Sequence, residues 1–142
     1  MKRKGFTLIE ITLALLIMGL FLFLISGNWG SFLSSSKLES QAKTVKAFIE
    51  FARDEAVNKC TGLSLVFNRT EVKAVIESER KEKTLKKLTL DEVKFETEKE
   101  EKVQIDELGR VSGRIPPLIY EGRRAEFKIV NPLLGIVDYE VK

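Results

Sequence analysis

The sequence predicts an α+β protein in which a long N-terminal helix packs, along its second half, on an antiparallel β-sheet or sandwich. Three observations predict this class. Residues 6–25 form an apolar run with a single charge, Glu10. Residues 37–59 carry apolar side chains at helical spacing, and residues 62–142 contain short stretches of alternating apolar and polar residues separated by turns. The chain is therefore one modest domain, residues 37–142, with an N-terminal anchor.

The apolar run is long enough to cross a bilayer. Twenty helical residues at about 1.5 Å each span roughly 30 Å, the thickness of the hydrocarbon core. Lys2, Arg3 and Lys4 precede the run, and such basic residues stay on the cytoplasmic side. We therefore expect a single-pass protein of the inner (cytoplasmic) membrane whose C-terminal domain is periplasmic or extracytoplasmic.

Residues 26–36 interrupt the helical pattern with two glycines and several serines. We expect a kinked or flexible connection here, with Trp29 in an interfacial aromatic belt. One of the serines 34–36 is the expected N-cap of the next helix. That helix, residues 37–59, presents one apolar stripe widened by Phe48 and Phe51, which consists of Leu38, Ala42, Val45, Ile49, Ala52 and Ala56.

The strands of the sheet are predicted from alternation and turn residues. Residues 77–87 are rich in charge and are expected to form a loop or frayed edge, and Pro116-Pro117 excludes a helix after residue 115. Cys60 is expected to be buried between the helix and the first strand. The predicted apolar strand positions are Leu63, Leu65, Phe67, Val72, Ala74, Ile76, Leu88, Leu90, Val93, Phe95, Val103, Ile105, Phe127, Ile129, Val137, Tyr139 and Val141.

Composition argues against several functions. The net charge of +3 comes from the three basic residues before the apolar run, because the rest of the chain has 21 basic and 21 acidic residues. Global charge therefore gives no support for nucleic-acid binding. There is no histidine, and the sequence has no nucleophile elbow, phosphate-binding glycine loop or metal-ligand cluster. We expect no enzyme activity, no cofactor, no metal and no small-molecule substrate.

Glu10 is the most informative residue of the apolar run. A carboxylate inside such a segment costs on the order of kcal/mol and normally has a partner. Lys4-Gly5 followed by Phe6-Thr7-Leu8-Ile9-Glu10 and an apolar helix resembles the class III signal of type IV prepilins and type II secretion pseudopilins. The resemblance implies cleavage between Gly5 and Phe6 by a prepilin peptidase, N-methylation of Phe6 and removal of residues 1–5 as a leader. It also implies that Glu10 pairs with the terminal amine of a neighbouring subunit.

Two other interpretations of the N-terminal region remain. One is a simple signal anchor in which Glu10 is tolerated near the membrane interface. The other is a secretory signal, since small residues follow the apolar run at Ser26, Gly27 and Gly30.

A second resemblance concerns the rest of the chain. Ala52-Arg53-Asp54-Glu55-Ala56-Val57 is similar to the Ala-Arg-Ser-Glu-Ala-Ile stretch of the GspH/FimT class of minor pseudopilins and minor pilins. Asp54 departs from that pattern. Gly109-x-x-Ser112-Gly113, and Gly135 before the last strand, also resemble the class, which implies a pilin-like helix packed on a β-sandwich.

Two functions follow as hypotheses. The first is a structural minor subunit of a type II secretion pseudopilus or a type IV pilus, with prepilin peptidase, other pilin or pseudopilin subunits and the membrane as partners. The second is a DNA-binding minor pilin in natural transformation, with Arg110, Arg114, Arg123 and Arg124 as candidate phosphate contacts. The DNA-binding members carry Gly-Arg-x-Arg, and Gly122-Arg123-Arg124-Ala125 lacks that spacing. The alternative interpretation is that these arginines are solvated loop charges with no binding role.

Overall fold

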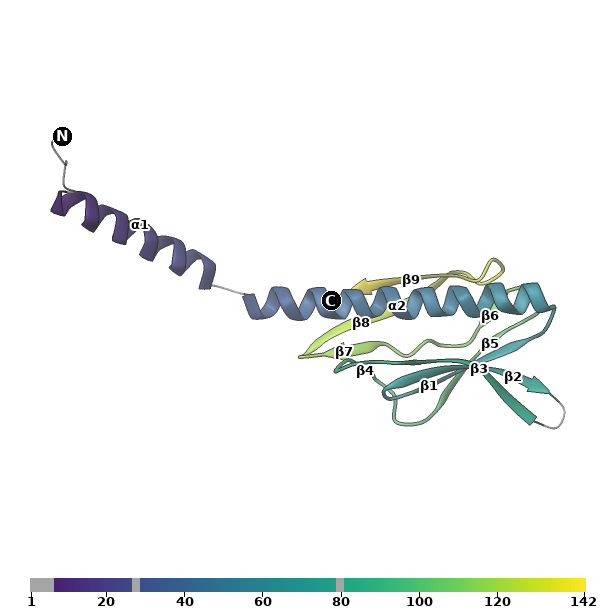
Figure 1. Ribbon diagram of the computed structural model, residues 1–142. Coiled ribbons are helices and arrows are strands. Elements are labelled where there is room, and N and C mark those ends of the chain that lie inside the picture. The colour runs from purple at the N-terminus through teal and green to yellow at the C-terminus, as the bar shows by residue number, and fades with distance from the viewer. Residues whose placement is uncertain (1–6, 27–28, 79–80) are drawn as a thin grey trace, which may run out of the picture. The chain divides into compact units, whose positions relative to one another are not determined.

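The computed structural model describes residues 7–26, 29–78 and 81–142. The chain divides into two compact units, Met1–Leu33 and Ser34–Lys142. Helix α1 (Leu8–Ser26) belongs to the first unit, and helix α2 (Trp29–Lys59) begins there and continues into the second (Figure 1). The second unit combines α2 with antiparallel sheets. This confirms the predicted α+β class.

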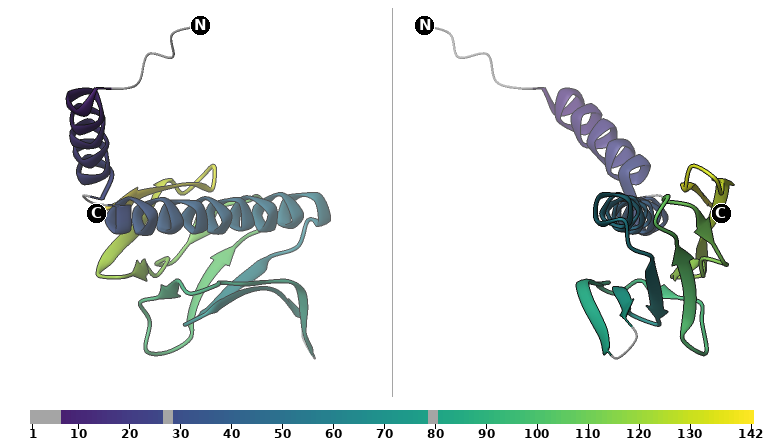
Figure 2. Two further views of the ribbon diagram at one scale, coloured as in Figure 1. Left: turned by 60° about the vertical axis from the view of Figure 1, so that its left-hand side comes forward. Right: turned by 90° about the vertical axis from the view of Figure 1, so that its right-hand side faces the viewer.

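The described strands form two antiparallel sheets. The five-stranded sheet has the order β3-β2-β1-β5-β6, and the four-stranded sheet has the order β4-β7-β8-β9. In the right-hand view of Figure 2, along α2, β8 and β9 lie to the right of the helix and β1, β2 and β3 lie below it. The strands are β1 (Leu63–Asn68), β2 (Glu71–Ser78), β3 (Lys81–Thr89), β4 (Lys94–Phe95), β5 (Glu101–Ile105), β6 (Val111–Ser112), β7 (Leu118–Tyr120), β8 (Arg123–Asn131) and β9 (Ile136–Val141).

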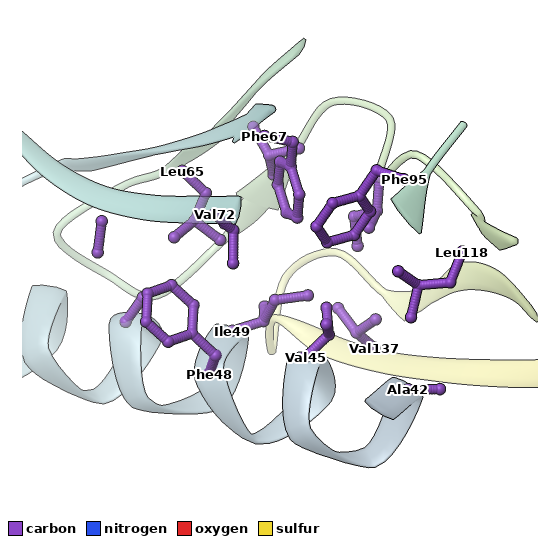
Figure 3. Close-up of a cluster of buried hydrophobic side chains, with 14 of the residues drawn as sticks. Ala42, Val45, Phe48, Ile49, Leu65, Phe67, Val72, Phe95, Leu118 and Val137 are labelled. Atoms are coloured by element: carbon purple, nitrogen blue, oxygen red, sulfur yellow. The ribbon is translucent and has the colours of Figure 1, made fainter. Parts of the chain in front are cut away.

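The core lies between α2 and the two sheets. All six residues of the predicted apolar stripe on α2 are fully buried, which confirms that prediction. Phe48 is also buried, whereas Phe51 is 36% exposed and stacks under the Lys86 ammonium, 4.3 Å from the ring centroid. Across from the helix, Phe67 of the first sheet meets Phe95 of the second edge to face, with ring centroids 5.1 Å apart (Figure 3). One apolar core therefore joins all three layers.

The start of α2 differs from the prediction. The helix begins at Trp29, eight residues before the expected Lys37, so the serines 34–36 lie inside the helix and cannot cap its N-terminus. Serine costs only about half a kcal/mol relative to alanine in a helix interior, and Ser34 is buried within the second unit. The predicted break at Gly27-Asn28 and the side chain of Trp29 lie outside the described residues.

The charge-rich segment 77–87, which was expected to be a loop or a frayed edge, belongs largely to strands, and the second of these, β3, is an edge strand. β2 continues to Ser78, and β3 covers Lys81–Thr89. Ile76, Leu85 and Leu88 pack against the core, while the exposed lysines between them face solvent. The sequence pattern was obscured because a register shift at Ala74/Val75 breaks the strict alternation of two residues. Charge is also usual on an edge strand.

The prediction that Cys60 is buried is wrong: the thiol is exposed. Cys60 follows α2 directly and has a φ of 47°, the left-handed conformation that commonly ends a helix. The adjacent Thr61 amide bonds back to the Ala56 carbonyl over 3.0 Å. This helix end turns the Cys60 side chain outward before the chain enters β1.

Candidate functional site

Helix α1 is apolar on all sides and is not covered by the chain. Residues Leu8–Ile25 are long and apolar enough to cross a membrane, and none of that stretch is buried. Its large side chains are 48–83% exposed. A helix that is hydrophobic all round needs an apolar environment. The chain therefore has one described N-terminal helix suited to a membrane, consistent with single-pass anchoring.

Glu10 lies in the first turn of α1, where its carboxylate is held by Thr7. The Thr7 amide and the Thr7 hydroxyl each donate to Glu10 Oε2 over 2.8 Å. In return the Glu10 amide donates to the Thr7 hydroxyl over 3.4 Å. This reciprocal arrangement is a capping box, and the sequence pattern Thr-x-x-Glu is typical of it. The sequence reasoning singled out Glu10 for a partner in another subunit and overlooked this local role.

The predicted cleavage site is not described by the structure. Gly5 and Phe6 lie before residue 7, where the described residues begin. Their separation from Glu10, five and four residues, is known from the sequence only. Cleavage there would leave Phe6 directly before Thr7, the residue that caps α1.

The second unit brings together the three motif fragments that resemble the minor pseudopilins. Arg53, Gly109 and Gly135 meet near the end of α2. A Cβ on Gly109 would stand 3.1 Å from Arg53 Cγ, and one on Gly135 would stand 2.7 Å from Arg53 Cδ and 2.3 Å from the Gly109 carbonyl oxygen. Both glycines have positive φ, 78° and 62°, so glycine is required there by conformation and by space.

Arg53 is fixed at this junction by polar contacts as well. Its Nε and Nη2 donate to Asp54 Oδ1 over 3.1 and 2.8 Å, and its Nη1 donates to the Leu134 carbonyl over 3.3 Å. The arginine therefore links the helix to the loop between β8 and β9. No spacing in the sequence predicted that residues 53, 109 and 135 converge, because the contact depends on tertiary packing.

The four candidate arginines do not form one group. Arg123 Nη1 donates to Ser35 Oγ over 2.7 Å, near the beginning of the second unit. Arg110 follows Gly109, which contacts Arg53. Ser35 and Arg53 lie eighteen residues apart on α2, roughly 27 Å at the rise of an α-helix. Arg110 and Arg123 thus stand near opposite ends of this part of the helix.

Two of these arginines are also neutralised within the chain. Arg110 Nε donates to Asp106 Oδ2 over 2.5 Å. Desolvation raises the pKa of Asp106, but the hydrogen bonds from Arg110 and from the Leu108 amide together lower it below its usual value. Arg124 pairs with Glu96 over 2.6 Å and with Glu126 over 3.7 Å. Paired arginines offer less charge to phosphate.

A separate polar cluster, formed by Lys37, Glu92 and Tyr120, connects the beginning of the second unit to β7. Lys37 forms an ion pair with Glu92, and the Tyr120 hydroxyl donates to Glu92 Oε2 over 3.2 Å. Lys37 and Tyr120 hold the pKa of Glu92 below its usual value. The cluster is exposed, and the ionised carboxylate accepts both bonds, so its effect is to hold α2 against β7.

Among residues 7–26, 29–78 and 81–142, no group of three or more side chains is placed to hold a metal ion. Comparison of the chain with family models, with curated proteins and with solved structures finds no match.

Proposed function

We propose that the chain is a structural minor subunit of a type II secretion pseudopilus or a type IV pilus, inserted through its N-terminal helix after processing by a prepilin peptidase. The observation that carries the proposal is the position of Glu10, the only charge in Leu8–Ile25, at the start of a helix whose apolar surface is exposed on all sides. A filament core built from such helices would bury that surface and give the carboxylate a cationic partner.

The second unit supports the same proposal. Its helix-on-sheet architecture agrees with the fold that the resemblance implies. The fragments around Arg53, Gly109 and Gly135, quoted separately for the resemblance, form one contact in space.

The capping box is a competing explanation for the presence of Glu10. Substitutions can distinguish capping of α1 from pairing with a neighbouring subunit's amine. Glutamine also completes a capping box but carries no charge. We expect Glu10→Gln to lose incorporation into sheared filaments as severely as Glu10→Ala, because both lack the negative charge that a neighbour's amine requires. Thr7→Ala removes the hydroxyl of the cap and keeps the carboxylate, and should retain incorporation. Normal incorporation of the glutamine variant would restrict Glu10 to capping.

Processing provides an independent test. Mass spectrometry of the membrane-extracted protein should find a methylated N-terminal Phe6. An intact Met1 would favour a simple anchor, and a start beyond Ser26 would favour a secreted domain; either result contradicts the proposal.

The DNA-binding alternative receives less support. Arg110 and Arg123 lie near opposite ends of the described part of α2, and Arg110 and Arg124 are paired with carboxylates. A gel shift with the full chain in detergent, repeated at low and high salt, should show no salt-sensitive complex.

A further inference from the structure

The long edges of the two sheets carry opposite charge. Of the four described edge strands, β4 and β6 have two residues each, while β3 has nine and β9 has six. Short edges offer little to pair with, whereas long edges present a row of backbone donors and acceptors. β3 contains four lysines and one glutamate, and β9 contains one aspartate and one glutamate without any basic residue.

The edge of β9 has backbone groups directed away from its neighbour. Arg124 and Lys142 exchange both of their hydrogen bonds, N to O, over 3.1 and 2.8 Å. In an antiparallel pair such positions alternate with positions whose backbone groups point to the other side. Val141 lies one residue from Lys142, and Val137 lies four residues before Val141 with the same alternation. The N–H and C=O groups of Val137 and Val141 therefore point away from β8.

A groove runs between this edge and α2. It has a volume of about 620 Å³, and its charged lining comprises Glu39, Lys43, Lys46, Glu50, Asp138 and Glu140. Four carboxylates face two lysines, and both lysines are already engaged: Lys43 with Glu39 at 2.9 Å and Lys46 with Asp138 at 3.3 Å. The groove is therefore acidic overall.

The edge of β3 lies on the other flank of α2. The Lys86 ammonium sits over the ring of Phe51 on the helix, and in the right-hand view of Figure 2 the teal strands, β3 among them, lie below α2 while β9 lies to its right. Lys83 and Lys86 are exposed, and so is Lys87, which pairs with Glu71 of β2. One subunit thus presents a basic strand edge on one flank and an acidic edge on the other.

We propose that β3 of one copy pairs with β9 of a second copy, so that copies of this chain associate head to tail through their sheet edges. Opposite charges on facing strands are favourable and like charges are unfavourable. Pairing of β3 with β3, or of β9 with β9, would set like charges against one another. The pattern therefore selects the unlike pair over both symmetric pairs.

Such a contact uses two different surfaces and so leaves one of each exposed at the ends of any assembly that does not close into a ring. A heterologous contact that does not close generates a helical filament. The inference deepens the proposed function, on which it rests for its biological setting. It implies that copies of this subunit occupy neighbouring positions in the filament.

Disulfide trapping in detergent tests the contact without requiring a filament. In a Cys60→Ser background, we would place single cysteines at Lys83, Thr84 or Lys87 of β3 and at Asp138 or Glu140 of β9, and mix differently tagged full-length variants under mild oxidation. Disulfides require Cα atoms within about 7 Å. The expected product is a β3–β9 dimer, with little β3–β3 or β9–β9 product. Absence of the mixed dimer at every pair of positions, or equal amounts of all three products, would overturn the proposal.

Charge reversal is the second test of the contact between β3 and β9. With the β9 cysteine moved to the exposed Ile136 and the β3 cysteine at Thr84, the double substitution Asp138→Lys, Glu140→Lys should abolish trapping. Lys83→Glu with Lys86→Glu in the partner, which leaves the Lys87–Glu71 ion pair intact, should restore it. The matched control is Glu98→Lys with Glu107→Lys, which makes the same change in net charge at exposed positions outside both edges. Loss of trapping in this control, or no loss in the edge variant, would contradict a charge-selected contact.

The two proposals fail in different ways. If filaments incorporate the chain normally while no β3–β9 disulfide forms, the edge contact is wrong and the subunit role stands. If Glu10→Gln and Glu10→Ala variants assemble normally, the charge-pairing basis of the subunit role fails, while trapping in detergent still reports on the edges.

Discussion

The two helices solve the burial of apolar side chains in different ways. In α2, Leu38 and Ile49 are fully buried against the sheets of the same unit, whereas Leu13 and Leu20 of α1 are 58% and 57% exposed. Leucine is present in both helices, so residue type alone does not set the outcome. The difference lies in periodicity: α2 confines its apolar residues to one stripe that the sheets cover, and α1 has apolar residues all round. The second unit can thus be stabilised by its own contacts, while α1 depends on an environment outside the chain.

The largest effect should separate two phenylalanines, one in each unit. Phe67 is fully buried and packs on Phe95, while Phe21 is 60% exposed. Phe67→Ala should lower the free energy of unfolding of the second unit by about 3–5 kcal/mol. Phe21→Ala should leave it unchanged and weaken extraction-resistant membrane binding instead. Urea unfolding of the full chain in detergent, followed by circular dichroism, measures the first. A similar loss of stability in both variants would show that α1 contributes to the core.

Two glycines give the next test, because both have positive φ but only one is enclosed. At Gly135 an added Cβ would approach the Gly109 carbonyl oxygen to 2.3 Å, while at Gly122, with a φ of 78°, nothing lies within 4 Å. Gly135→Ala should destabilise the second unit by roughly 2–4 kcal/mol through strain and overpacking. Gly122→Ala should cost only about 1 kcal/mol, from its conformation. Equal costs would mean that the junction with Arg53 adjusts easily.

A carboxylate on the sheet predicts how stability depends on pH. Glu71 accepts hydrogen bonds from Lys73 and Lys87, which lower its pKa to about 2. A pKa below the unfolded value means that this contribution is fully present above about pH 4.5 and is lost as the pH falls toward 2. Glu71→Gln should flatten the acid limb of the unfolding free energy over that range. Glu98→Gln, at an exposed position in the loop before β5, is the control and should leave the acid limb as it is; an unchanged limb in the Glu71 variant would contradict the prediction.

Much of the fold could be predicted because it rests on local periodicity. The stripe on α2 and the alternation in β1, β8 and β9 are visible in single stretches of sequence. The extent of β3 was missed because its lysines suggested a loop or a frayed edge and because the irregular register beside Ala74 hides its alternation. At the candidate site, Glu10 was recognised from its position, and its bond to Thr7 could have been read from Thr-x-x-Glu. The contact of Arg53 with Gly109 and Gly135 could not, since it joins segments more than twenty residues apart.

The smallest effect is expected at Cys60, which lies between α2 and β1 and contributes little to the free energy of unfolding. Its thiol is exposed, and Sγ donates a weak hydrogen bond to the Val57 carbonyl over 3.6 Å. Cys60→Ser should therefore change the free energy of unfolding by less than about 0.5 kcal/mol. In the native protein the thiol should react with a maleimide about as fast as a free cysteine does, because no unfolding is needed to expose it. Reaction only after addition of urea would show that the thiol is buried in the folded protein, contrary to this prediction.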